Sequence, residues 1–272
     1  MSRKNGRILG FISIKGGVGK TTSVINLAAS LSNDYEKKVV VVDANFSSPN
    51  VSLHLGSVDH KKDLHQVLSD KIHVGEALYE SDFGFHFVPS SFSTTKTNFM
   101  KLNDSVKVLK KFYDFVLIDS SPSLNDELVA AMVASDELYA VTTPDIPTLS
   151  TTLRAIKLAK NKGTQIKGLI LNNVRNKKYE LKTKDIEKVC GVPVIGLLKH
   201  SLKVSESMHD VKPVVISSPY SEVSLGFKKL ASYFCGEAFN KPRKLRLLLS
   251  RFKDDYGSFV RHDFSKSLVY YK

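Results

Sequence analysis

A glycine-rich segment near the start of the chain constrains its fold more than any other feature of the sequence. Residues 12–22 read Ile-Ser-Ile-Lys-Gly-Gly-Val-Gly-Lys-Thr-Thr. An apolar run at 8–12 precedes this segment, and apolar residues at helical spacing follow it from 24 to 31. The glycines therefore stand where a β-strand turns into an α-helix. That context predicts a phosphate-binding loop, and the alternative is an ordinary glycine turn.

The residues of this loop suit a nucleoside triphosphate with its magnesium ion. Glycines let backbone N–H groups converge on phosphate oxygens without interference from Cβ atoms, and the following helix adds its positive N-terminal end. We expect Lys20 to reach the β- and γ-phosphates and Thr21 to offer its hydroxyl to Mg²⁺. The residues predicted to line the phosphate site are Gly16, Gly17, Val18, Gly19, Lys20, Thr21 and Thr22.

The loop departs from the usual GxxxxGK(S/T) pattern, because Ile14 replaces the first glycine and Lys15 stands at the entrance. In this form it resembles the deviant P-loop of the ParA/MinD superfamily, and MinD-like proteins most closely. The resemblance extends over roughly residues 7 to 235 and implies an ATPase that dimerises face to face around two ATP molecules. It also implies that Lys15 contacts the ATP phosphates of the partner subunit. Without the resemblance, Lys15 is a solvated loop cation.

Short apolar runs alternate with helical patterns, which predicts a doubly wound, mostly parallel sheet with helices on both faces. The runs at 39–42 and 115–118 are entirely apolar and each precedes an aspartate, as is typical of buried parallel strands. In such a sheet, ligands bind beyond the carboxyl ends of the strands. Further strands are expected at 85–88, 138–142, 167–171 and 192–197, and helices at 106–111, 126–134, 149–160, 181–189 and 223–234.

Two strand-end aspartates are predicted to lie on the magnesium side of the site. Asp119 has the position of a Walker B carboxylate and can hold Mg²⁺ directly or through water, whereas the alternative is a helix cap. Asp43 opens a segment that resembles the superfamily's switch I region, which usually reads Asp-x-Asp. The predicted ligands of Mg²⁺ are Thr21, Asp43 and Asp119.

The second switch position holds Asn45 instead of aspartate. An amide can hydrogen-bond the attacking water but carries no charge to polarise it. We therefore expect either slow hydrolysis or a larger role for Asp43. The candidate catalytic residues are Lys15, Lys20, Asp43 and Asn45.

Two later segments are assigned through the resemblance. Asn172 follows the strand at 167–171 and matches the asparagine that contacts the adenine base in the superfamily, because a side-chain amide offers the matching donor and acceptor. A turn asparagine is the alternative, and Asn173 is a competing assignment. The segment 142–145, Thr-Thr-Pro-Asp, resembles a loop that lines the superfamily's dimer face and is otherwise an ordinary turn.

The formal net charge of +13 predicts an anionic partner besides the nucleotide, either nucleic acid or an acidic lipid surface. Residues 240–272 carry nine lysines and arginines against three aspartates and so contribute +6. Cys190 and Cys235 lack the spacing of a zinc or iron–sulfur site, which argues against an iron–sulfur carrier. We see no signal peptide and no apolar run of about 18 residues, and we expect a cytoplasmic protein.

The end of the chain is predicted to be distinct from the nucleotide-binding domain, which we place at 1–236, with a basic tail at 237–272. Within 243–253, leucines and a phenylalanine recur at i, i+3, i+4 and i+7 among cations, which predicts a basic amphipathic helix. Such a helix can bind an anionic membrane, each cation adding about 1 kcal/mol, or pack onto the domain. Two copies in an ATP-bound dimer would bind more tightly, so we expect peripheral membrane association in that state.

The leading hypothesis is a MinD-like ATPase switch. It predicts ATP-dependent homodimerisation, slow hydrolysis stimulated by a protein partner, and membrane or partner association that positions a division site or a surface apparatus. The alternatives are a ParA-like segregation ATPase that binds DNA non-specifically and a scaffold that binds ATP with little turnover. A bacterial-type tyrosine kinase is a further class, but Tyr270 and Tyr271 are a small cluster for its C-terminal phosphorylation sites.

Overall fold

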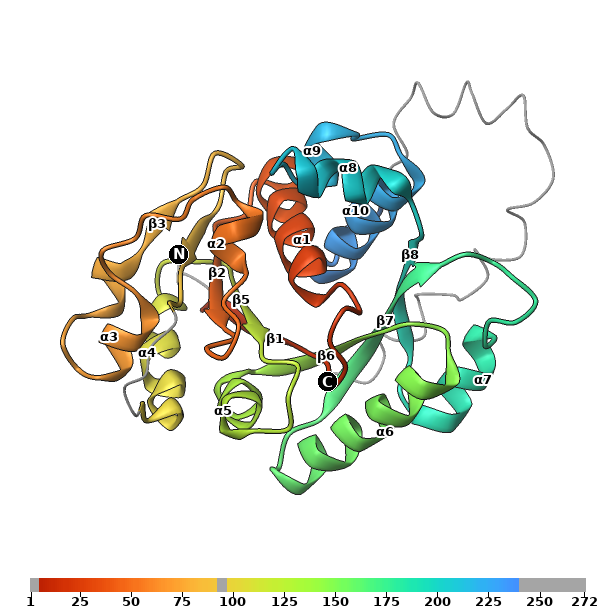
Figure 1. The fold of residues 1–272 in the computed structure, drawn as a ribbon, viewed down its shortest axis with the longest axis horizontal. Coiled ribbons are helices and arrows are strands. Elements are labelled where there is room, and N and C mark those ends of the chain that lie inside the picture. The colour runs from red at the N-terminus through yellow and green to blue at the C-terminus, as the bar shows by residue number, and fades with distance from the viewer. Residues whose placement is uncertain (1–4, 92–96, 240–272) are drawn as a thin grey trace. The chain divides into compact units, whose positions relative to one another are not determined.

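A sheet of eight strands lies at the centre of the part of the chain that the computed structural model describes, residues 5–91 and 97–239 (Figure 1). Its order is β3-β4-β2-β5-β1-β6-β7-β8. All neighbouring strands are parallel except the pair β3 and β4. The strands are β1 (Arg7–Ile12), β2 (Val39–Ala44), β3 (Tyr79–Glu80), β4 (His86–Val88), β5 (Phe115–Ser120), β6 (Glu137–Thr142), β7 (Ile166–Val174) and β8 (Val194–Lys199).

Helices cover both faces of this sheet (Figure 1). The α-helices are α1 (Lys20–Tyr35), α2 (Val51–His54), α3 (Leu64–Leu68), α4 (Leu102–Leu109), α5 (Asp126–Ala134), α6 (Ile146–Asn161), α7 (Thr183–Cys190), α8 (Leu202–His209), α9 (Val214–Ser217) and α10 (Glu222–Cys235). Two short 3₁₀ helices, η1 (Val74–Ala77) and η2 (Phe99–Lys101), lie among the described residues.

Alternation of side chains along the strands divides the core into two layers. Val39 and Val41 of β2 pack with α1, α9 and α10, whereas Val40 and Val42 pack with α3, α4 and α5. Beside β6 and β7, α5, α6 and α7 form a further apolar cluster. All six residues of β2 are buried, and its run of four consecutive valines is typical of an inner parallel strand that is covered on both faces.

The prediction of a doubly wound, mostly parallel sheet with helices on both faces is confirmed. Helix α5 has the expected bounds, whereas α6 begins at 146 and not at 149. The earlier start has a local cause, because Asp145 caps the helix by accepting a hydrogen bond from the backbone N–H of Thr148 at 2.9 Å. We did not predict β3, α2, α3 or α9, which have two to five residues each and are too short to show a periodic pattern.

The register of the central strands positions the site. Asp119 of β5 pairs with Asp43 of β2 on one side and with Phe11 of β1 on the other. The three strands therefore end at the same edge of the sheet. Helix α1, which follows the loop after β1, begins beside Asp119.

None of the helices within residues 5–91 and 97–239 is long and apolar enough to cross a lipid bilayer. The segment 243–253 lies outside the described residues, so the amphipathic helix stays a prediction. The division between 1–236 and 237–272 also stays a prediction.

Candidate nucleotide-binding site

The glycine-rich loop joins β1 to α1 and takes a backbone shape that glycine favours. Gly17 has φ of 76° and Gly19 has φ of 84°, both in the left-handed region. A Cβ atom at Gly19 would lie 2.2 Å from Nδ2 of Asn172, so this position also lacks space for a side chain. A Cβ atom at Gly16 or Gly17 would meet nothing within 4 Å. Protein packing therefore does not require a glycine at 16, and an open loop of this kind suits the close approach of a phosphate.

The first turn of α1 presents two side chains to the end of β5. Lys20 Nζ lies 2.6 Å from Asp119 Oδ1 and also donates to the backbone oxygen of Ser120. Thr21 Oγ1 donates to Asp119 Oδ2 at 2.6 Å. Lys20 is 7% exposed and Asp119 is fully buried. The structure thus brings the adjacent Lys20 and Thr21 together with the carboxylate of Asp119, which lies about a hundred positions later in the sequence.

Asp43 adds a second buried carboxylate beside this group. It accepts hydrogen bonds from the backbone N–H groups of Asn45, Asn50 and Val51 at 3.0–3.1 Å. Burial raises the pKa of Asp43 to about 7, with a further contribution from the negative charge of Asp119. When Asp43 and Asp119 are both ionised, the single ammonium group of Lys20 leaves an excess of one negative charge. A divalent cation would neutralise this excess, so the donor set fits Mg²⁺.

Lys15 is partly exposed at the protein surface, whereas Lys20 is buried. Lys15 Nζ donates to Thr148 Oγ1 at 2.8 Å and lies 3.6 Å from Asp145 Oδ1. The side chains of Lys15 and Asp145 are both 43% exposed. The structure therefore places Lys15 beside the loop at 142–145, the two features that the resemblance assigns to a dimer face.

Comparisons with known proteins agree with this arrangement. The family model described as "AAA domain" matches residues 6–167. An uncharacterized ATP-binding protein of Methanocaldococcus jannaschii is 33% identical over 233 residues, which cover 85% of this chain and 88% of that protein. The structure of the cell division ATPase MinD of Pyrococcus furiosus superposes with a TM-score of 0.80 at 31% identity, covering 85% of this chain and 99% of that one. The chain belongs to the ParA/MinD superfamily.

A second solved relative bears on the ligand. The septum site-determining protein MinD of Pyrococcus horikoshii, complexed with Mg-ADP, superposes with a TM-score of 0.79 at 31% identity. The match covers 84% of this chain and 95% of that one. The nucleotide-binding part of the superfamily fold is therefore present over nearly its whole length in this ParA/MinD protein.

The structure distinguishes the two candidate asparagines of this superfamily member. Asn172 Nδ2 donates to the backbone oxygen of Val18 at 2.7 Å, which places its amide against the phosphate-binding loop. Asn173 has φ of 59° and its Oδ1 contacts His200 Nδ1 at 2.6 Å, away from that loop. Asn172 is thus the residue positioned beside the site, and its contact with adenine stays a prediction.

The segment after β2, where the superfamily has switch I, is held at several points. Asn45 is 3% exposed, and its Nδ2 donates to the backbone oxygen of Ser48. Its Oδ1 is buried and accepts no hydrogen bond from the residues that the structure describes. Two contacts were not predicted from the sequence. Glu127 contacts Ser47 in this segment, and Thr148 contacts Lys15 of the glycine-rich loop. The spacing of Asp145 and Thr148 is a helix-cap pattern that could have indicated the second contact.

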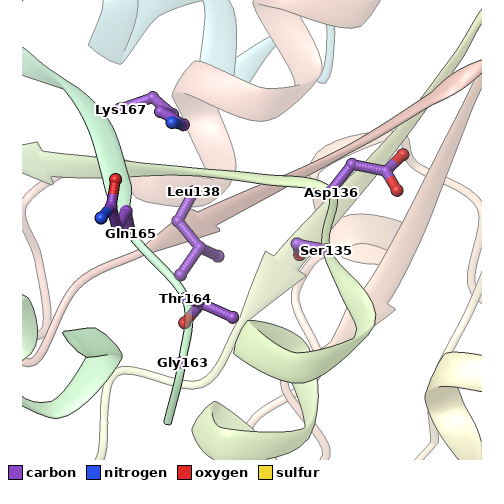
Figure 2. A pocket seen from close by; sticks show the side chains of 7 residues that line it. All are labelled: Ser135, Asp136, Leu138, Gly163, Thr164, Gln165 and Lys167. Atoms are coloured by element: carbon purple, nitrogen blue, oxygen red, sulfur yellow. The ribbon is translucent and has the colours of Figure 1, made fainter. Parts of the chain in front are cut away.

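A surface hollow of about 340 Å³ lies at the opposite edge of the sheet, near the start of β6 and β7 (Figure 2). Asp136 at its rim is paired with Lys110, whose Nζ lies 2.8 Å from Asp136 Oδ2. The hollow contains none of the candidate site residues. Its lining residues are Ser135, Asp136, Leu138, Gly163, Thr164, Gln165 and Lys167.

Within residues 5–91 and 97–239, no group of three or more His, Cys, Asp or Glu side chains is placed to hold a metal ion. The predicted magnesium ligands are two carboxylates and the hydroxyl of Thr21. Such a sparse set is compatible with Mg²⁺, which keeps several waters and usually shares its coordination with substrate phosphates.

Proposed function

We propose that this ParA/MinD protein is a MinD-like ATPase switch. It binds ATP with Mg²⁺, forms a homodimer when ATP is bound, and hydrolyses the nucleotide slowly. The observation that carries the proposal is the cluster of Lys20, Thr21 and Asp119 directly behind the glycine loop. The Mg-ADP complex of the Pyrococcus horikoshii relative supports the same ligand class.

Each residue of the cluster has a role in this proposal. Backbone N–H groups of 16–19 hold the phosphates, and Lys20 exchanges its bond with Asp119 for a phosphate oxygen. Thr21, Asp43 and Asp119 hold Mg²⁺ directly or through water. When bound, Mg²⁺ supplies positive charge that offsets the charge of the phosphates. Val18 and Thr22 complete the loop around the phosphates, and Asn172 contacts the adenine base.

Replacement of Asn45 by aspartate tests the hydrolytic part of the proposal. A carboxylate at this position can polarise the attacking water, so we expect Asn45→Asp to raise the turnover number at least ~10-fold, within the range of general-base effects. Phosphate release under saturating ATP measures this effect. An unchanged turnover number would assign polarisation of the water to Asp43. If the wild type and Asn45→Asp both bind ATP without hydrolysing it, the ATP-binding scaffold is favoured.

Attachment to an anionic membrane completes the leading proposal. The basic segment 243–253 binds the lipid surface, and two copies in the ATP-bound homodimer bind more tightly than one. Stimulation of hydrolysis by a protein partner then releases the dimer. The protein is accordingly cytoplasmic and peripherally membrane-associated when it holds ATP, and its role is the spatial positioning of a division site or a surface apparatus.

One observation favours the second candidate, a ParA-like ATPase that binds DNA non-specifically. Residues 150–190 contain eleven lysines and arginines against three acids, a net charge of +8. All eleven side chains are exposed, and none forms an ion pair with the residues that the structure describes. The exposed basic residues of this segment are Arg154, Lys157, Lys160, Lys162, Lys167, Arg175, Lys177, Lys178, Lys182, Lys184 and Lys188.

A pair of variants separates the membrane from the DNA. We expect truncation after 239 to lower binding to anionic liposomes at least ~10-fold, because it removes six net positive charges and the apolar face of the tail. Charge reversal of the exposed Arg154, Lys157 and Lys184 in the segment 150–190 serves as the matched variant. Liposome sedimentation and DNA binding across a salt series measure the two affinities.

The outcomes identify the partner. Loss of lipid binding on truncation with DNA binding unchanged supports the MinD-like proposal. If charge reversal abolishes a steeply salt-dependent DNA affinity and truncation leaves lipid binding unchanged, the ParA-like function replaces it.

A further inference from the structure

Glu127 is a buried carboxylate that the proposed mechanism does not yet use. It lies in the first turn of α5 and is 6% exposed. Its Oε1 accepts a hydrogen bond from Ser47 Oγ, and its Oε2 accepts one from the backbone N–H of Ser47 at 3.2 Å. No ion pair within residues 5–91 and 97–239 includes Glu127. Burial of a carboxylate is costly unless hydrogen bonds compensate, and both of these bonds go to one residue.

Ser47 belongs to the short segment that carries Asn45. On one side of Ser47, the backbone N–H of Asn45 donates to Asp43 at 3.1 Å. On the other side, the Asn45 amide nitrogen donates to the backbone oxygen of Ser48. The segment is therefore fastened to β2 through Asp43 and to α5 through Glu127. Ser47 itself is exposed, so its own side chain is held by the contact with Glu127, whereas the neighbouring Phe46 is buried and packs against His65 and Phe99.

The orientation of the Asn45 amide follows from these contacts. Because Nδ2 is bound to Ser48, Oδ1 is the atom left to accept a further hydrogen bond, and it is buried without one from the described residues. A buried amide oxygen of this kind is suited to accept a hydrogen bond from a water molecule. In the proposed reaction, that water is the nucleophile.

We propose that Glu127 is a positioning residue for ATP hydrolysis. Through Ser47 it fixes the segment 45–48, so that Oδ1 of Asn45 holds the attacking water in place. This inference rests on the proposed ATPase function and deepens it. Glu127 itself does not touch the substrate and transfers no proton.

A carboxylate is better suited to this contact than an amide. Two acceptor oxygens match the two donors of Ser47, its hydroxyl and its backbone N–H. In Glu127→Gln, one terminal atom becomes an NH₂ group, which cannot accept from the backbone N–H. The positive end of α5 also favours a negative charge in its first turn. The glutamine variant should therefore retain part of the function, and the alanine variant should lose it.

The test compares Glu127→Ala, Glu127→Gln and Ser47→Ala in the full chain, with the neighbouring exposed Asp126→Ala as the control. We expect the Kd for ATP to stay within ~3-fold of the wild type in all of them, because no phosphate or magnesium ligand changes. We expect kcat to fall at least ~10-fold in Glu127→Ala. The fall should be smaller in Glu127→Gln and in Ser47→Ala, which keeps the bond from the backbone N–H of residue 47, and absent in Asp126→Ala. The double variant Ser47→Ala/Glu127→Ala should be no slower than Glu127→Ala alone.

Three outcomes would overturn the inference. Unchanged kcat in Ser47→Ala, with an active wild type, shows that the contact does not position the reacting water. Additive losses in the double variant show that the two residues act separately. If the slower variants also have a lower melting temperature and bind ATP more weakly, the contact only stabilises the fold. If the wild type itself binds ATP without hydrolysing it, the proposed function fails and the inference fails with it. If Glu127→Ala does not fold, the kcat of Ser47→Ala tests the inference.

Discussion

Replacement of Lys20 by alanine is expected to abolish ATP binding, with a loss of affinity of at least ~100-fold. Lys20 is the only cation that forms an ion pair with Asp119 among the described residues, and it directly follows the glycine loop that is predicted to hold the phosphates. The substitution also leaves Asp43 and Asp119 as buried carboxylates without a cation, which costs about 3–5 kcal/mol of unfolding free energy when a buried pair is broken. Calorimetry with ATP and Mg²⁺ measures the first effect, and thermal unfolding measures the second.

The pH dependence of the unfolding free energy provides a second measurement on Lys20→Ala. The pKa of Asp43 is about 7 in the folded protein against 3.8 for a free side chain, so the folded state holds a proton that the unfolded state releases. Stability from this group is therefore lost as pH rises from 3.8 through about 7. We expect Lys20→Ala to be more destabilised at pH 8 than at pH 6. The exposed Lys188→Ala is the control, and unchanged ATP affinity in Lys20→Ala would refute the site assignment.

Replacement of Lys15 by alanine is expected to remove ATP-dependent dimerisation and to leave ATP binding within ~3-fold of the wild type. Lys15 does not enter the buried cluster, and its contacts go to Thr148 and Asp145 at the surface. If it bridges to the phosphates of the partner subunit, its loss removes a charge-assisted contact from each half of the dimer. Analytical ultracentrifugation with ATP and Mg²⁺ measures the dimer fraction.

Lys160→Ala is the matched control for this second prediction. Lys160 is exposed in the last turn of α6 and forms no ion pair with the described residues. We expect it to dimerise as the wild type does. An ATP-dependent dimer of normal stability in Lys15→Ala would contradict the role that the superfamily resemblance assigns to Lys15.

The sequence predicted the parts of the site that depend on short stretches of chain. The glycine loop, the helix that follows it and the aspartates at the ends of β2 and β5 all stand where they were expected. These features have local causes, namely the φ preference of glycine and the period of apolar residues. Elements of two to five residues, such as β3 and α9, were missed because they are too short to show a periodic pattern.

The sequence by itself therefore determined the fold class, the phosphate-binding loop and the identity of the charged side chains. Only the tertiary structure decided which of them meet. The contact between Asn172 and Val18 joins residues 154 positions apart, and the contact between Ser47 and Glu127 joins residues 80 positions apart. Such contacts depend on the order and register of the strands, which is set by packing over the whole sheet and leaves no mark in any one segment.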